Sequence, residues 1–208
     1  MKFIIYAFLA IITTSQTLEA RDKLMAGDII LLPIDCYACK AIEKETGSPY
    51  AHSGLVVFEN GYPIILEAWS KVEKTPLKDF IKRAKKGVSI KYIRSKEISK
   101  RYNSEHSRKE LNQFILNFFE ENYENLSYDN EYLWDNLDEN GNEVLYCSEM
   151  ITKLLNHVLK VKMPTYKMTY DIARDFWIKY FKGKIPQGKP GNNPGSFLKS
   201  GLFYTLDI

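Results

Sequence analysis

Apolar residues in segment 146–158 recur at the spacing of one face of a helix. They are Cys147, Met150, Ile151, Leu154, Leu155 and Val158. This pattern predicts an amphipathic helix whose apolar face packs on a core. The preceding stretch, 138–142, is rich in turn-forming residues, so Cys147 is expected at or near the first helical turn.

Four short segments in the front half have the composition of β-strands. A turn and a buried strand are expected over 26–33, and further strands over 53–59, 62–69 and 88–94. The second and third strands are separated only by Asn60-Gly61, which is the dipeptide most typical of a tight hairpin.

Helical patterns occupy much of the remaining chain. The predicted helices cover 36–46, 75–85, 107–123 and 169–181. Thr75 is expected to cap the second of these with Pro76 at its first position, and Ser107 with Glu110 fits a capping box for the third. The segment 183–195 reads as a long loop, and 196–205 is expected to return to the body. Strands at the front and helices at the back predict an α+β fold.

The first twenty residues are typical of a secretory signal peptide. Lys2 precedes a short apolar run over 3–12, and a small residue, Ala20, ends the segment at the expected cleavage site. The apolar run is too short to span a bilayer comfortably. We therefore predict an exported protein with a single domain over 21–208 and no stable membrane span after cleavage.

Composition fits one globular domain, with 208 residues of which 45% are hydrophobic and 26% charged. The net charge of +3 is too small to indicate nucleic-acid binding. The basic cluster 82–86 is expected to form the solvated face of a helix. Cys36 and Cys39 are close enough in sequence to form a disulfide, which leaves Cys147 as the odd thiol in an oxidising compartment.

The position of Cys147 suggests a nucleophile. Unpaired N–H groups and the positive end of the helix dipole stabilise a thiolate at a helix start. The alternative is that Cys147 only packs, because free cysteine is among the most buried residue types. The helix alone does not decide between these interpretations, whereas a partner histidine would.

The hairpin supplies such a histidine. With a two-residue turn, Glu59 faces Tyr62 and Gly54 faces Glu67, and His52 shares the face of Gly54 because strand side chains alternate. Glu67 is then diagonal to His52 at about 7–8 Å, within reach of long side chains. A carboxylate on one imidazole nitrogen and a thiol on the other is the arrangement of a base held by an orienting group. Taken alone, each residue is better explained structurally, with His52 capping the strand start and Glu67 facing solvent at a strand end. Their position on one face, together with a helix-start cysteine in the same chain, favours the catalytic interpretation.

Six short motifs, taken in order, resemble those of one family. They are Gly27-Asp28-Ile29-Ile30, Tyr50-Ala51-His52-Ser53-Gly54, Leu66-Glu67-Ala68, Thr75-Pro76-Leu77, Tyr128-Asp129 and Tyr146-Cys147-Ser148-Glu149. The chain is similar in these to the YiiX-like proteins, which are permuted papain-like cysteine amidases of the NlpC superfamily. Segment 194–198 looks like a degraded form of the family's C-terminal segment.

The resemblance implies a circularly permuted papain-like fold in which a helix carrying the cysteine packs on an antiparallel sheet. It makes Cys147 the nucleophile, His52 the general base and acid, and Glu67 the orienting residue. Substrates would be amides or esters, with cell-wall peptides and lipids as the usual candidates. No cofactor or metal is expected, and Cys36 and Cys39 lie outside the family pattern.

Three other functions compete with this one. The segment from Cys36 to Cys39 resembles a thioredoxin active site, with Pro63 as the start of its proline-led strand. However, a thioredoxin needs a helical crossover where this chain has a hairpin. A binding module with an inactive site is the second alternative.

The third alternative is calcium binding in the loop before Cys147. Asn136, Asp138, Asn140 and Gly141 match part of an EF-hand loop, but the twelfth position is Cys147 instead of glutamate. A polar turn is therefore the favoured interpretation. His106 and His157 are predicted to lie on the surface, and no role is assigned to them.

Overall fold

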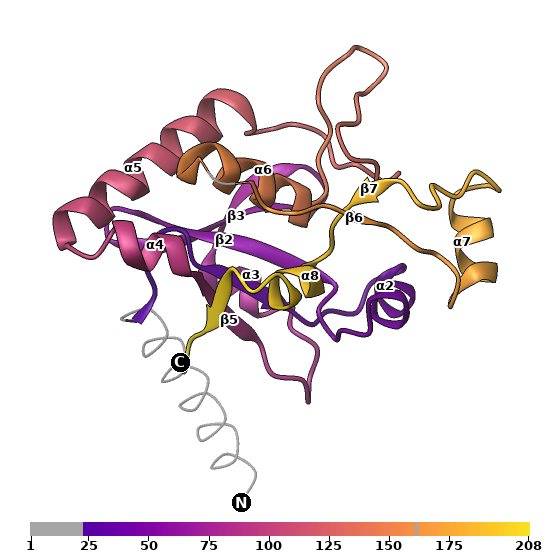
Figure 1. The fold of residues 1–208 in the computed structure, drawn as a ribbon, viewed down its shortest axis with the longest axis horizontal. Coiled ribbons are helices and arrows are strands. Elements are labelled where there is room, and N and C mark those ends of the chain that lie inside the picture. Colours follow the sequence, from indigo (N-terminus) through magenta and orange to yellow (C-terminus); the bar gives the residue numbers. More distant parts are fainter. Residues whose placement is uncertain (1–22, 161) are drawn as a thin grey trace, which may run out of the picture.

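A computed structural model describes residues 23–160 and 162–208 (Figure 1), so the predicted signal peptide lies outside the described residues. Its main sheet has six strands in the order β4-β3-β2-β1-β5-β8, and all neighbouring strands are antiparallel. The strands are β1 (Ile29–Leu32), β2 (His52–Glu59), β3 (Tyr62–Ala68), β4 (Val72–Pro76), β5 (Lys91–Ser95) and β8 (Phe203–Thr205). A two-stranded sheet joins β6 (Tyr166–Lys167) to β7 (Pro190–Gly191).

Helices cover the main sheet, and the α+β prediction is confirmed. They are α2 (Cys39–Thr46), α3 (Leu77–Ile81), α4 (Lys96–Arg101), α5 (Glu105–Asn122), α6 (Cys147–Leu159), α7 (Arg174–Tyr180) and α8 (Pro194–Lys199). Helices α5 and α6 lie side by side over β2 and β3, while α2 and α7 lie at the opposite end of the molecule from α4 (Figure 1). None of the helices in the described ranges has both the length and the apolar character needed to cross a membrane.

The sheet is buried on both faces, which explains the continuous apolar run of β1. Ile29 and Leu31 join a core with the apolar face of α6, whereas Ile30 and Leu32 join a second core around Phe80. Successive side chains of a strand point to opposite faces, so in a strand covered on both sides both sets of side chains face a core. This sandwiching fixes α6 against the strands that carry His52 and Glu67.

A third, largely aromatic cluster joins α2 to α7. Tyr170 and Trp177 are buried in it, and the rings of Tyr132, Tyr180 and Phe181 pack around them. Aromatic pairs of this kind contribute beyond the area that they bury. The cluster forms one wall of the region in front of Cys147.

The predicted helix over 75–85 is wrong in its first part. Thr75 and Pro76 end β4 instead, opposite Ile65 and Ile64 of β3, and only Leu77–Ile81 is helical. A β-branched residue suits a strand, and a proline is tolerated at a strand end where its missing N–H is not needed. Cross-strand pairing therefore outweighs the helix-start pattern.

Other boundaries also move. Helix α2 begins at Cys39 and not at residue 36, because residues 37–38 form a turn. Helix α5 begins earlier than predicted, since Ser104 is its cap and Ser107 completes the reciprocal capping box. The strand predicted over 88–94 is β5, which covers Lys91–Ser95.

The C-terminal part is more structured than its composition predicts. The expected helix over 169–181 is helical only over Arg174–Tyr180. The predicted loop 183–195 contains β7 and the start of α8, which Asn193 and Ser196 cap reciprocally. Beyond α8, β8 returns to the main sheet beside β5, as expected for 196–205.

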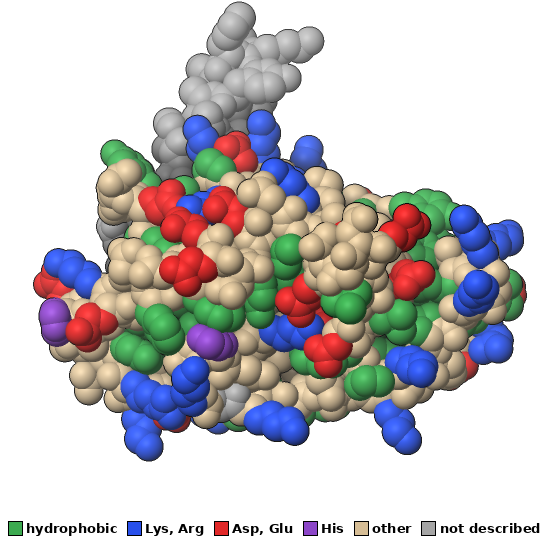
Figure 2. Space-filling model, turned by 90° about the horizontal axis from the view of Figure 1, so that it is seen from above, with side chains coloured by type: hydrophobic (Ala, Val, Ile, Leu, Met, Phe, Trp, Pro, Cys, Tyr) green, Lys and Arg blue, Asp and Glu red, His purple; other side chains and the backbone are tan. Residues whose placement is uncertain are grey.

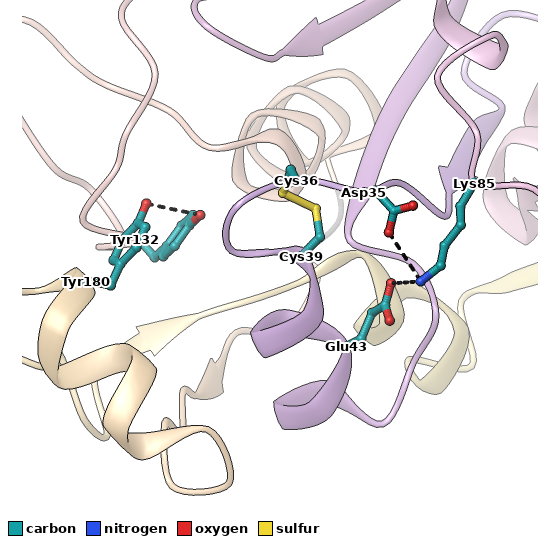
Figure 3. The surroundings of a disulfide bond; sticks show 7 residues. All are labelled: Asp35, Cys36, Cys39, Glu43, Lys85, Tyr132 and Tyr180. Atoms are coloured by element: carbon teal, nitrogen blue, oxygen red, sulfur yellow. Dashed lines mark hydrogen bonds and ion pairs between the residues drawn. A yellow bond between two sulfur atoms is a disulfide. The ribbon is translucent and has the colours of Figure 1, made fainter.

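Acidic and basic side chains are spread over the face seen in Figure 2, with apolar groups between them. The basic cluster 82–86 was predicted to form a solvated face, but only part of it is exposed to solvent. Lys85 forms ion pairs with Asp35 at 3.4 Å and Glu43 at 3.5 Å (Figure 3). The side chain of Arg83 points inward and hydrogen-bonds to Glu67.

Candidate active site

Cys147 is the first residue of α6 and is a free thiol with 4% of its surface exposed. Its neighbour Tyr146 has extended backbone and makes no side-chain cap, so the first N–H groups of the helix are left for another acceptor. The helix begins here because its apolar face must lie on the sheet, and the chain just before it is held by a bridge between Leu145 and Tyr128. The thiol therefore lies where a helix start meets β2.

The β2–β3 hairpin has the predicted register, with Glu59 opposite Tyr62 and Leu55 opposite Leu66. His52 starts β2, and its Nε2 lies 2.6 Å from Oε2 of Glu67. Both side chains are buried, with His52 2% and Glu67 0% exposed. The two-residue turn therefore places the carboxylate on the face of the imidazole, as the alternation of strand side chains requires.

Arg83 and Thr75 hold the other side of Glu67. The Arg83 Nη2 donates to Glu67 Oε1 at 2.5 Å, and the guanidinium stacks over Trp69 at 4.7 Å. Burial alone would raise the pKa of Glu67, but hydrogen bonds with His52, Thr75 and Arg83 lower it below its usual value. Glu67 is thus an ionised carboxylate at neutral pH.

The imidazole of His52 lies between two aromatic rings and two anions. Trp69 and Phe80 have ring centroids 5.1 Å and 5.5 Å from it. Burial would lower the pKa of His52, but the Cys147 thiolate and the Glu67 carboxylate together raise it to about 9. Because Nε2 faces Glu67, Nδ1 is the nitrogen left for the thiol.

The pKa of Cys147 is lowered correspondingly. Burial would raise this pKa, but the positive charge of His52 and its hydrogen bond to the sulfur outweigh the effect of burial. Hydrogen bonds with Ser53 lower the pKa further. The two groups titrate as a pair, in which a thiolate and an imidazolium stabilise each other. A thiolate is the nucleophilic form of cysteine.

Tyr128 lies beside this pair. A β-bridge from Tyr128 to Leu145 holds it against the start of α6, and the buried carboxylate of Asp129 accepts the N–H groups of Glu131 and Leu133. Burial and the charge of Cys147 raise the pKa of Tyr128 well above 10, so its hydroxyl stays protonated. The site therefore has a neutral hydrogen-bond donor close to the sulfur.

Two hollows adjoin the pair. The smaller, of about 110 Å³, has Cys147 and Ser148 in its wall, and six aromatic side chains are among its other lining residues. The larger, of about 450 Å³, is lined by His52 and Trp69. The two hollows share four lining residues, which are Ile42, Ala51, Tyr128 and Tyr132. The reacting groups thus lie between them.

Cys36 and Cys39 form a disulfide with their Cα atoms 5.0 Å apart (Figure 3), and Cys36 lines the larger hollow. Pro63 lies in the antiparallel hairpin strand β3, not in the crossover-linked parallel strand that a thioredoxin requires. This geometry gives no support to a thioredoxin-like active site.

The remaining candidate residues lie apart from the site. The carboxylate of Asp138 accepts N–H groups of Asn140 and Asn142, which is the arrangement of a polar turn. His106 and His157 are exposed as predicted, and His157 stacks on Phe118 with ring centroids 3.9 Å apart.

Residues 23–206 match the model of the family described as permuted papain-like amidase enzymes, YaeF/YiiX, C92 family. The chain belongs to this family, and its fold is of the permuted papain-like class. It is 28% identical over 137 residues to the uncharacterized protein YiiX of Escherichia coli strain K12, a match covering 66% of this chain and 60% of that protein. The chain thus spans less than two thirds of that relative.

A solved structure has a similar fold. The crystal structure of metalloprotein YiiX from Escherichia coli O157:H7 aligns with a TM-score of 0.73 and 23% identity, over 88% of this chain and 96% of that one. Within the described residues of this chain, no group of three or more His, Cys, Asp or Glu side chains is placed to hold a metal ion.

Proposed function

We propose that this protein is an exported cysteine hydrolase that cleaves amide or ester bonds through an acyl-enzyme on Cys147. His52 acts as general base and acid, and Glu67 orients it. The observation that carries the proposal is the line of three buried groups, with the imidazole of His52 between Glu67 at 2.6 Å and the thiol at the helix start.

The reaction follows from the charges of the site. The thiolate of Cys147 attacks the carbonyl carbon, and negative charge develops on the carbonyl oxygen. We assign the backbone N–H of Cys147 and the hydroxyl of Tyr128 as the donors to that oxygen, because donors aimed at developing charge supply much of the rate enhancement in such sites. His52 then gives its proton to the leaving group, and later takes one from the water that hydrolyses the thioester.

The two hollows take different parts of the substrate. The acyl part stays bonded to sulfur, so it occupies the smaller hollow, whose wall contains Cys147. The leaving group must receive its proton from His52, so it occupies the larger hollow, which His52 lines. The aromatic wall of the smaller hollow favours an acyl part with apolar surface.

The substrate class follows from export and from the family. A chain with the signal-peptide pattern of residues 1–20 meets cell-wall peptides and lipids outside the cytoplasm. Both contain amide or ester bonds. We therefore place cell-wall peptides and lipids first among the candidate substrates.

The test is a search for hydrolysis with a matched knockout. Purified protein is incubated with cell-wall peptides and, separately, with lipid extracts, and products are followed by mass spectrometry. We expect fragments that have gained one water, formed by the wild type and by Cys36→Ser with Cys39→Ser, and lost in Cys147→Ala. Hydrolysis that persists in Cys147→Ala would overturn the proposal.

A further inference from the structure

One residue of the basic cluster 82–86 contacts the buried carboxylate of the site. The guanidinium of Arg83 lies with Nη2 2.5 Å from Oε1 of Glu67. The side chain of Arg83 is 25% exposed and that of Glu67 0%. Lys82 and Lys86 of the same cluster are exposed to solvent. The cluster thus supplies one cation to a carboxylate that water does not reach.

The turn that carries Arg83 is fixed by backbone hydrogen bonds. The N–H of Arg83 donates to the carbonyl of Phe80 at 3.3 Å, within α3. Two residues further on, the N–H of Lys85 donates to the carbonyl of Pro33 at 2.7 Å. These bonds join the turn to α3 on one side and to the chain just after β1 on the other. The guanidinium therefore approaches Glu67 from a fixed direction.

The contact with Arg83 determines how Glu67 meets His52. Oε1 of the carboxylate accepts from Arg83, and Oε2 lies 2.6 Å from Nε2 of His52. A planar carboxylate with a charged partner on each oxygen has little freedom to rotate. The guanidinium also compensates the charge of Glu67, since a buried carboxylate without a partner takes up a proton. A protonated Glu67 would no longer stabilise the imidazolium.

Two aromatic rings form a second link between Arg83 and His52. The guanidinium carbon lies 4.7 Å from the ring centroid of Trp69 and 5.1 Å from that of Phe80. The same two rings lie 5.1 Å and 5.5 Å from the imidazole. Because a guanidinium is attracted to the face of an aromatic ring, Arg83 helps to fix both rings that enclose the imidazole.

We propose that Arg83 is a positioning residue of the thiol–imidazole pair, and that it acts by keeping Glu67 charged and aimed at Nε2 of His52. This inference rests on the proposed function and adds a fourth group to its triad. When the pair is charged, the signs alternate from guanidinium to carboxylate, imidazolium and thiolate. Loss of the guanidinium then makes the thiolate at the far end easier to protonate.

A purely structural ion pair would have a different effect. Its loss would change the free energy of unfolding and the amount of folded protein, but not the pH at which Cys147 becomes a thiolate. Loss of a positioning Arg83 raises this pH, because Glu67 is then easier to protonate and the imidazolium loses its partner. The pH dependence of the thiol therefore distinguishes the two roles.

Other titratable groups near Glu67 do not cancel this effect. They are His52 on β2, Glu73 on β4 and Cys147 on α6. Glu73 lies opposite Glu67 in the strand register, so its negative charge adds to the upward shift once the guanidinium is lost. Near the thiol, Tyr128 stays neutral because its pKa is raised well above 10. Glu149 of α6 pairs with Lys153 at 2.9 Å.

The test follows alkylation of Cys147 by iodoacetamide from about pH 4 to pH 9. The rate rises with the thiolate fraction, and the midpoint of this rise does not depend on how much protein is folded. In Arg83→Gln, which keeps a donor for Glu67 but removes the charge, we expect the midpoint to move up by roughly half to one pH unit. A direct partner causes about 1–3 units, and Arg83 acts on the thiol through Glu67.

Three further variants locate the effect. Arg83→Lys keeps the charge but not the planar group, so its midpoint is expected between those of the wild type and Arg83→Gln. Lys82→Gln is the matched control, since it removes one charge from the neighbouring exposed position, and it is expected to keep the wild-type midpoint. In a Glu67→Gln background, Arg83→Gln is expected to cause no further shift, because its effect passes through the carboxylate.

Two results would overturn the positioning role. One is an unchanged midpoint in Arg83→Gln that urea unfolding shows to be folded. If that variant does not fold, Arg83→Met takes its place, since its apolar chain can still pack on the rings. The other is a full shift in the Glu67→Gln background, which would mean that Arg83 does not act through the carboxylate.

Either result leaves the proposed function standing if the wild-type midpoint lies well below that of glutathione and His52→Ala raises it. A wild-type midpoint equal to that of glutathione, unchanged in His52→Ala, would instead refute the proposed function.

Discussion

Replacing Glu67 by glutamine isolates the orienting role of this carboxylate. Glutamine has nearly the same size and keeps one oxygen that can accept from Arg83 or His52. It removes the negative charge that lies 2.6 Å from His52 Nε2 and 2.5 Å from Arg83 Nη2. The imidazolium formed when His52 takes a proton then loses its stabilising partner.

The expected loss is larger for chemistry than for folding. Removing the carboxylate behind a catalytic histidine lowers kcat by on the order of 10²–10⁴. Breaking a buried ion pair outright costs about 3–5 kcal/mol of stability, but glutamine retains a hydrogen bond and is expected to cost about 1–3 kcal/mol. The variant is therefore expected to fold and to be nearly inactive.

The assay is steady-state hydrolysis of 4-nitrophenyl acetate, an activated ester that reports acyl transfer without a known natural substrate, together with urea unfolding. Glu59→Gln is the control, since Glu59 lies at the far end of β2 and pairs with Lys74 at 2.8 Å. It is expected to retain full activity. A folded Glu67→Gln protein whose kcat is within about twofold of wild type would refute the orienting role.

Three further predictions concern the surroundings of the site. Cys36→Ser with Cys39→Ser is expected to keep ester hydrolysis and to lose about 2 kcal/mol in urea unfolding; abolished hydrolysis would point to redox chemistry instead. Burial raises the pKa of Glu149 to about 7, so its protonated form favours the folded state. Its contribution to the free energy of unfolding, about 3 kcal/mol, is fully present below pH 4.5 and is lost as the pH rises through 7. Urea unfolding at pH 5 and pH 8 is therefore expected to differ less for Glu149→Gln than for the wild type. A Cβ at Gly54 would clash with Ile65 and lie 2.8 Å from Phe80, so Gly54→Ala is expected to cost about 1–3 kcal/mol in urea unfolding; unchanged stability would show that both side chains move aside without cost.

The hairpin could be predicted because its signals are local. Asn60-Gly61 selects a two-residue turn, and the alternation of strand side chains then places Glu67 on the face of His52. The helix start at Cys147 was equally local, since apolar spacing and a turn-forming loop mark it. That these two elements meet depends on the fold, which the resemblance to a family supplied.

Other parts of the site could not be predicted because they depend on tertiary packing. Arg83 lies among four other residues of a basic cluster, and nothing in their sequence distinguishes the one that turns inward to Glu67. Thr75 has the sequence pattern of a helix start, but it lies in strand β4 because pairing with β3 outweighs the local pattern. From there it forms a hydrogen bond with Glu67. Ile42 and Tyr132, which line both hollows, are far apart in the sequence and meet only through the packing around the aromatic cluster that joins α2 to α7.

The activation of Cys147 by His52 is the central claim, and alkylation near pH 6 tests it most directly. An unperturbed thiol is almost entirely protonated at that pH, with roughly 0.3% as thiolate. With iodoacetamide, and the labelled cysteine mapped by mass spectrometry, we predict that Cys147 of the wild type reacts much faster than glutathione and that His52→Ala removes most of this advantage. Equal rates for wild type and His52→Ala would contradict the account.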